Sequence, residues 1–108
     1  MITLPKNLIP GTESVQTVTN AAVGITAATI KPNTGIFKGQ QAKAVFITIE
    51  TDAIRITLDG VTTVTDAIGH LMAVTTDDPI IIYGKQAIND FRMIRVTNDA
   101  AVRVTPYF

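Results

Sequence analysis

The sequence contains no cysteine and no tryptophan, and its only serine is Ser14. Without cysteine the chain cannot form a disulfide, and it offers no thiolate as a metal ligand or nucleophile. Ser14 does not stand in a Gly-x-Ser-x-Gly motif, so nothing in the sequence indicates a Ser–His–Asp catalytic triad. We therefore expect a protein that is not an enzyme and whose stability comes from packing.

Long apolar runs are also missing. No stretch approaches the ~20 apolar residues of a membrane-spanning helix, so we expect no membrane partner. The first residues, MITLPKNLIPGT, lack a continuous apolar core and are interrupted by Pro5 and Pro10. They are not expected to act as a signal peptide, and we expect the protein to be made in a cytoplasm.

An excess of either charge is absent as well. Nine basic and nine acidic residues give a formal net charge of +0. A neutral chain lacks the basic face that nucleic acids require, so no nucleic-acid partner is expected. Neutrality also leaves little charge repulsion between copies, which favours self-association.

β-branched residues are abundant: Val, Ile and Thr supply 42 of the 108 residues. Apolar and polar residues alternate with period 2 in several short segments, which is typical of strands with one buried face. Frequent turn signals separate these segments. We predict an all-β fold, a single antiparallel β-sandwich or jelly roll of about 7–8 short strands over residues 13–108, preceded by an extended N-terminal arm over residues 1–12. The predicted strands lie within residues 14–19, 24–30, 42–50, 53–58, 79–83, 91–97 and 100–108.

His70 is the only histidine, and it follows Asp66 by four residues and Asp59 by eleven. A zinc site needs three or four ligands, and one histidine without cysteine leaves only carboxylates to complete it. We expect His70 to pack or hydrogen-bond locally at the end of a loop. No metal and no cofactor are expected.

The aspartates fall at predicted turns, where their side chains accept hydrogen bonds from nearby backbone amides. The Asp59-Gly60 pair is a turn signal that ends one strand and begins a long loop. No D-x-D-x-D-G spacing occurs, which excludes an EF-hand, whereas a calcium site built from several loops stays open. The aspartates concerned are Asp59, Asp66, Asp77, Asp78, Asp90 and Asp99.

Three arginines, Arg55, Arg95 and Arg103, fall on the polar faces of predicted strands. They can pair across a sheet with Glu50 and Asp59, and a solvated sheet face is the favoured interpretation. The alternative is a subunit contact, where arginine is over-represented.

Aromatic residues at unusual places indicate an interface. Phe46 stands on the face that otherwise carries polar residues, and the chain ends in two aromatic residues after Pro106. Such positions favour a second covered face or a contact with another protein. The predicted interface residues are Leu4, Leu8, Ile9, Phe46, Arg55, Arg103, Tyr107 and Phe108.

Two stretches, IRITLDGVTTVTDAIGHLM and PIIIYGKQAINDFRMIRVTNDAAVRVTPYF, resemble small structural proteins of tailed bacteriophage virions. The resemblance covers roughly residues 53–108. Its pattern is an Arg-bearing strand before Asp-Gly, a Thr-rich loop to Gly-His-x-Met, an apolar strand, FRMIR and a last strand ending near VT-Y-F. Two departures are Val64-Thr65, where such proteins often have Pro-Thr, and Pro106, which splits the ending.

This resemblance implies a virion component, most plausibly a capsid cement or decoration protein. Such proteins bind the major capsid protein as dimers or trimers on the capsid surface and reinforce the particle. The alternatives are a phage tail or head-fibre component, and a small carbohydrate-binding β-sandwich module. Against the last, aromatic residues make up only 6% of the chain, whereas sugar sites usually present aromatic faces.

Overall fold

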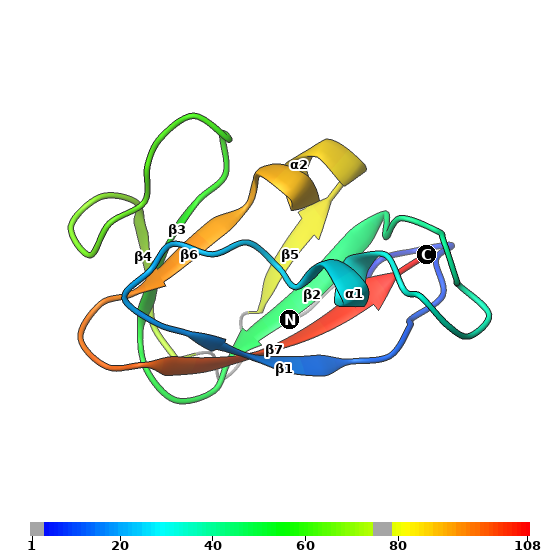
Figure 1. The fold of residues 1–108 in the computed structure, drawn as a ribbon, viewed down its shortest axis with the longest axis horizontal. Helices are drawn as coiled ribbons and strands as arrows, with labels where there is room; N and C mark the ends of the chain where they lie inside the picture. The colour runs from blue at the N-terminus through cyan, green and yellow to red at the C-terminus, as the bar shows by residue number, and fades with distance from the viewer. Residues whose placement is uncertain (1–3, 75–78) are drawn as a thin grey trace.

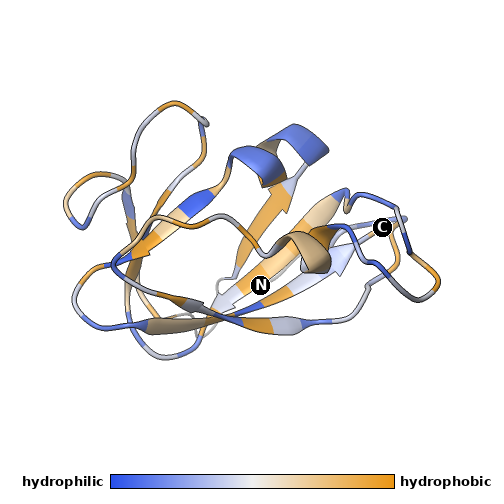
Figure 2. Cartoon of the chain, viewed as in Figure 1, coloured by the Kyte–Doolittle hydropathy of each residue, from blue (hydrophilic) through white to orange (hydrophobic). Residues whose placement is uncertain are grey.

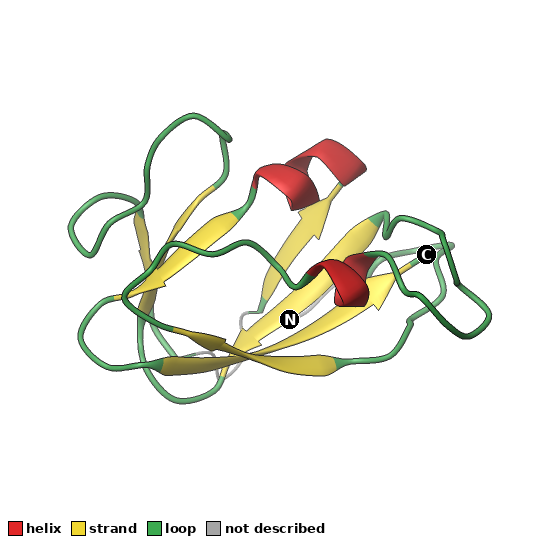
Figure 3. Ribbon diagram, in the orientation of Figure 1, coloured by secondary structure: helices red, strands yellow, loops and turns green. Residues whose placement is uncertain are grey.

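Alternating apolar residues build two antiparallel sheets, which form the two layers of a sandwich (Figure 1). The structure, a computed structural model, describes residues 4–74 and 79–108. Sheet A has the strand order β1-β7-β2-β5, and sheet B has the order β4-β3-β6. Two short helices, α1 (Ala27–Ile30) and α2 (Lys85–Asp90), accompany them (Figure 3). The strands of the described residues are β1 (Ser14–Val18), β2 (Ala44–Ile49), β3 (Ile54–Thr57), β4 (His70–Met72), β5 (Ile80–Tyr83), β6 (Arg92–Arg95) and β7 (Ala100–Tyr107).

β2 and β7 form the centre of sheet A, and they follow the predicted alternation. Val45, Ile47 and Ile49 are fully buried, and on β7 the buried Val104 lies opposite Ile47. Residues between them, such as Phe46, point to the other face of the sheet and are half-buried. A continuous apolar inner face therefore fixes the register of this pair.

The hydrophobic core lies between the two sheets. On sheet B, Ile54 and Ile56 of β3 and Met93 of β6 belong to the same buried cluster as the inner residues of β2 and β7. Both Met93 and Ile94 are buried. Neighbouring residues of a strand point to opposite faces, so each face of β6 carries one buried apolar residue.

Residues 24–30 differ from the prediction. They were expected to form a strand, but residues 27–30 form one helical turn, closed by a bond of 2.8 Å from the Lys31 amide to the Ala27 carbonyl. Thr29 and Ile30 point into the core from this turn. The strand prediction was wrong because Ala27 and Ala28 favour helix, and burial of Ile30 does not need an extended chain.

β5 and α2 show two further differences. The continuous apolar run PIIIY is consistent with a strand covered on both sides, but β5 is the last strand of sheet A and Tyr83 at its end is 56% exposed. The turn signal at Tyr83-Gly84-Lys85 leads into α2 and not only into a loop. α2 presents a hydrophilic surface (Figure 2) and buries Ile88 alone.

The N-terminal residues meet the end of β7. Ile9 and Phe108 exchange two backbone hydrogen bonds of 2.9 Å, and the Gly11 amide donates to the Pro106 carbonyl at 2.7 Å. Residues 9–11 thus continue the edge of sheet A on which β1 lies. A free arm over residues 1–12 is not confirmed, and its first three residues lie outside the described residues, as do Asp77 and Asp78.

No helix of residues 4–74 and 79–108 is long and apolar enough to span a bilayer.

Candidate functional site

A long loop over residues 58–69 connects β3 to β4, and we call this loop together with His70 and Leu71 of β4 the 58–71 segment. It begins with the predicted Asp59-Gly60 turn, in which Gly60 has a φ of 71°. Oδ1 of Asp59 accepts bonds from the amides of Val61 (3.0 Å) and Thr62 (2.9 Å), and Oδ2 accepts one from the Thr62 hydroxyl (2.5 Å). One carboxylate therefore organises the whole first turn.

The second turn of the segment is organised by a threonine. Oγ1 of Thr65 accepts bonds from the amides of Ala67 (3.2 Å) and Ile68 (2.9 Å). The Thr65 amide also donates to the Ile68 carbonyl at 3.0 Å. Between the two turns Val64 is buried, so the loop is anchored to the body of the protein at its middle.

Arg55 ties the second turn to β3. Its Nε donates to the Asp66 carbonyl at 2.8 Å, and its Nη1 donates to the Gly69 carbonyl at 3.0 Å. Arg55 was expected to pair with a carboxylate or to contact a subunit. In the structure its guanidinium donates to two carbonyls of the loop and not to a carboxylate, and it thereby ties the loop to β3.

Large apolar side chains nevertheless point outward from this ordered segment. Val61 is 86% exposed, Ile68 is 50% exposed and Leu71 is 58% exposed, and Leu58 joins them. Figure 2 shows apolar residues on both projecting turns between β3 and β4. An ordered loop with exposed apolar side chains is a candidate contact surface.

A small cleft of about 370 Å³ lies beside the first turn. It brings together Asp59 and His70, the two residues that the sequence singled out, although no hydrogen bond joins them in the described chain. Thr57 also lines it, and the buried Oγ1 of Thr57 has no hydrogen-bond partner among the described residues. The remaining lining residues are Leu58, Thr62 and Gly69.

The Asp59 carboxylate is strongly stabilised in its charged form. The hydrogen bond from the Thr62 hydroxyl, followed by those from the Val61 and Thr62 amides, lowers the pKa of Asp59 from 3.8 to about 2. No group of three or more histidine, cysteine or acidic residues that could hold a metal ion occurs in residues 4–74 and 79–108. The cleft is therefore an anionic hydrogen-bonding site without the ligand set of a metal centre.

The predicted interface residues do not form one surface. Arg103 lies on the outer face of sheet A, where it contacts Glu13 at 2.9 Å and Glu50 at 3.0 Å. The hydrogen bond that Arg103 donates to Glu50, followed by the one that it donates to Glu13, raises the pKa of Arg103. Phe46 lies on the same face, opposite Ile81 of β5.

The two C-terminal aromatic residues pack within the domain. Tyr107 and Phe108 are buried, and the ring of Phe108 stacks on that of Phe37 with centroids 4.4 Å apart. Of the N-terminal residues, Leu4 and Ile9 are exposed and Leu8 is half-buried. Val61, Ile68 and Leu71 were not predicted from the sequence as site residues. Their apolar side chains within a segment rich in turn signals could have predicted that they are exposed.

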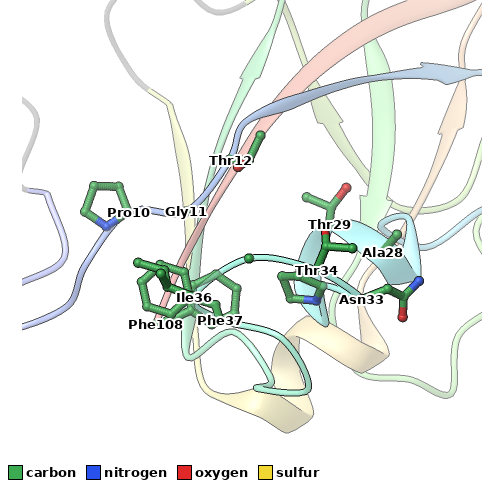
Figure 4. Close-up of a pocket in the computed structure, with 12 residues that line it drawn as sticks. Pro10, Gly11, Thr12, Ala28, Thr29, Asn33, Thr34, Ile36, Phe37 and Phe108 are labelled. Atoms are coloured by element: carbon green, nitrogen blue, oxygen red, sulfur yellow. The ribbon is translucent and has the colours of Figure 1, made fainter.

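A larger cleft of about 600 Å³ (Figure 4) lies beside α1, at the end of the sandwich opposite the 58–71 segment (Figure 1). Phe37, Phe108 and Ile36 lie on one side of it, and the residues of α1 and of the following turn lie on the other. None of its lining residues has a charged side chain. They are Pro10, Gly11, Thr12, Ala28, Thr29, Pro32, Asn33, Thr34, Gly35, Ile36, Phe37 and Phe108.

Comparison of the chain with protein-family models, with curated proteins and with solved structures finds no match.

Proposed function

We propose that this protein is a non-enzymatic structural component of a phage virion, a cement or decoration protein that binds the capsid shell as an oligomer. The 58–71 segment is the proposed docking element. It belongs to the stretch that carries the resemblance to virion proteins, and it holds apolar tips outward on an ordered loop.

The observation that carries this proposal is the combination of order and apolar exposure at Val61 and Ile68. A preformed loop loses little conformational entropy when it docks, so more of its contact energy appears as affinity. Many identical copies on one particle add avidity, so each contact can be small.

The test uses the full chain and capsids assembled from the major capsid protein of the phage that encodes it. Co-sedimentation measures binding to these capsids, and thermal disassembly measures their reinforcement. We expect Val61→Asp and Ile68→Asp each to weaken binding about tenfold or more, because docking would bury an unpaired charge.

Ile36→Asp is the matched control, since Ile36 is 84% exposed at the opposite end of the sandwich. It should leave binding unchanged. Capsids that bind neither the wild-type chain nor any oligomer of it would refute the docking role, as would equal losses in all three variants.

The end cleft favours a second candidate, the carbohydrate-binding module. Its lining is uncharged, and it combines the stacked Phe37 and Phe108 with the side chains of Thr12, Asn33 and Thr34. Neutral hydrogen-bonding groups beside an aromatic wall suit a neutral sugar. Retention on an array of neutral glycans, reduced by Asn33→Ala, would favour this function, whereas an array without retention would remove it.

A further inference from the structure

The cleft between the end of β3 and the first turn of the 58–71 segment contains a charge that nothing in the described chain neutralises. Asp59 is ionised at neutral pH, and three hydrogen bonds lower its pKa further, to about 2. No lysine or arginine of the described residues forms an ion pair with it. The nearest arginine along β3, Arg55, donates to loop carbonyls instead.

Thr57 supplies a second, independent sign of a missing ligand. Its side chain is only 5% exposed and lines the same cleft, and its Oγ1 has no partner among the described residues. A buried hydroxyl without a hydrogen bond costs about 1–3 kcal/mol. A ligand that hydrogen-bonds to this hydroxyl would recover that energy.

We propose that this cleft receives a cationic side chain, an arginine or lysine, from the surface on which the protein docks. The acceptors are Oδ2 of Asp59, which among the described residues accepts only the bond from the Thr62 hydroxyl, and the Thr57 hydroxyl in the wall of the cleft. Exposed Leu58 on the rim covers the apolar stem of the entering side chain. An arginine fits best, because its guanidinium donates several hydrogen bonds in one plane.

This inference rests on the proposed docking function and names the chemistry of the partner. It requires that the two parts of the site act together: Val61 and Leu71 provide apolar contact, and the cleft beside them provides one directed ion pair. The apolar tips then supply affinity, while the ion pair selects partners that present a cation at that point.

The test titrates ethylguanidinium, a small mimic of the arginine head, into the isotope-labelled full chain and follows amide NMR signals. Ethylurea has nearly the same shape without the charge and serves as the matched ligand. We expect ethylguanidinium to shift the amide signals of Thr57, Thr62 and Gly69 in a saturable way, and ethylurea to leave them unchanged.

Two variants test whether the changes in the amide signals come from binding at the Asp59 carboxylate. Asp59→Asn keeps an oxygen that accepts the two amide bonds and removes the charge, and it should weaken ethylguanidinium binding about tenfold or more. Asp66→Asn, in the same loop but outside the cleft, should bind as the wild type does. Equal shifts with ethylurea, or unchanged binding by Asp59→Asn, would overturn the inference.

The docking proposal and the proposed cationic contact can be refuted independently of each other. Ethylguanidinium binding involves no capsid, so its absence refutes the cationic contact and leaves the docking proposal standing. Absence of capsid binding by the wild-type chain refutes the docking proposal. Capsid binding that is the same for the wild type and Asp59→Asn refutes the cationic contact alone.

Discussion

The backbone of the loop in the 58–71 segment is held by hydrogen bonds with individual side chains and not by regular secondary structure. Asp59 and Thr65 each accept bonds from two successive backbone amides, and Arg55 donates to two carbonyls. Backbone groups that would otherwise depend on water are thereby satisfied within the protein. The Asp59 turn could be predicted from the Asp-Gly pair, whereas the Arg55 bridge could not, because it depends on how the loop returns to β3.

The first prediction concerns the titration of Asp59. Carbon-detected NMR should give a midpoint of about 2 for the wild type, because the Thr62 hydroxyl and two amides stabilise the carboxylate. Thr62→Val removes the largest cause and should move the midpoint upward toward 3.8. A midpoint that is unchanged by Thr62→Val would show that the hydroxyl contributes nothing.

The lowered pKa of Asp59 also predicts that the free energy of unfolding depends on pH. Because the folded pKa lies below the unfolded one, the contribution of Asp59 is fully present above pH 3.8 and is lost as the pH falls toward 2. Urea unfolding of the wild type and Asp59→Asn should therefore differ at pH 6 and converge near pH 2. A difference that stays constant over this range would contradict the assignment.

Gly69 gives a prediction on backbone strain. Its φ is 122°, and a Cβ there would lie 2.8 Å from the Ile56 carbonyl oxygen. Gly69→Ala should lower the free energy of unfolding by about 2 kcal/mol or more. Gly35→Ala is the control, since Gly35 also has a positive φ but has nothing near its Cβ position. It should cost less in the same urea titration, and equal losses would exclude the clash as the cause.

At the scale of elements, the strands with strict alternation were predicted correctly because burial of one face fixes both their existence and their register. β2, β3 and β7 are of this kind. The helix α1 was missed since a single turn has no periodicity of its own and forms through packing of Ile30. β4 was missed because a three-residue strand is too short to show alternation.

The end of β7 yields a prediction at this scale. Phe108 is buried between Phe37 and the segment around Gly11, where an added Cβ would lie 2.7 Å from its ring. Phe108→Ala should lower the free energy of unfolding by roughly 3 kcal/mol. Ile36→Ala, on the same loop as Phe37 but 84% exposed, should change it by less than about 0.5 kcal/mol. Comparable losses in the two variants would contradict the packing role of Phe108.

At the scale of the whole molecule, two surfaces lie at opposite ends of the sandwich. One is the 58–71 segment with its apolar tips and anionic cleft, and the other is the uncharged end cleft. The sequence indicated the first stretch through its resemblance to virion proteins. It could not indicate that Asp59, His70 and Thr57 share one cleft, because their proximity depends on the closure of the loop.

The most direct test of the docking proposal is a cryo-electron microscopy reconstruction of capsids that have been incubated with the protein. The account predicts density for the protein at repeated positions on the shell, with the turns at Val61 and Ile68 against the major capsid protein and the end cleft facing away. Density in which the 58–71 segment points to solvent, or a bare shell at saturating protein, would contradict it.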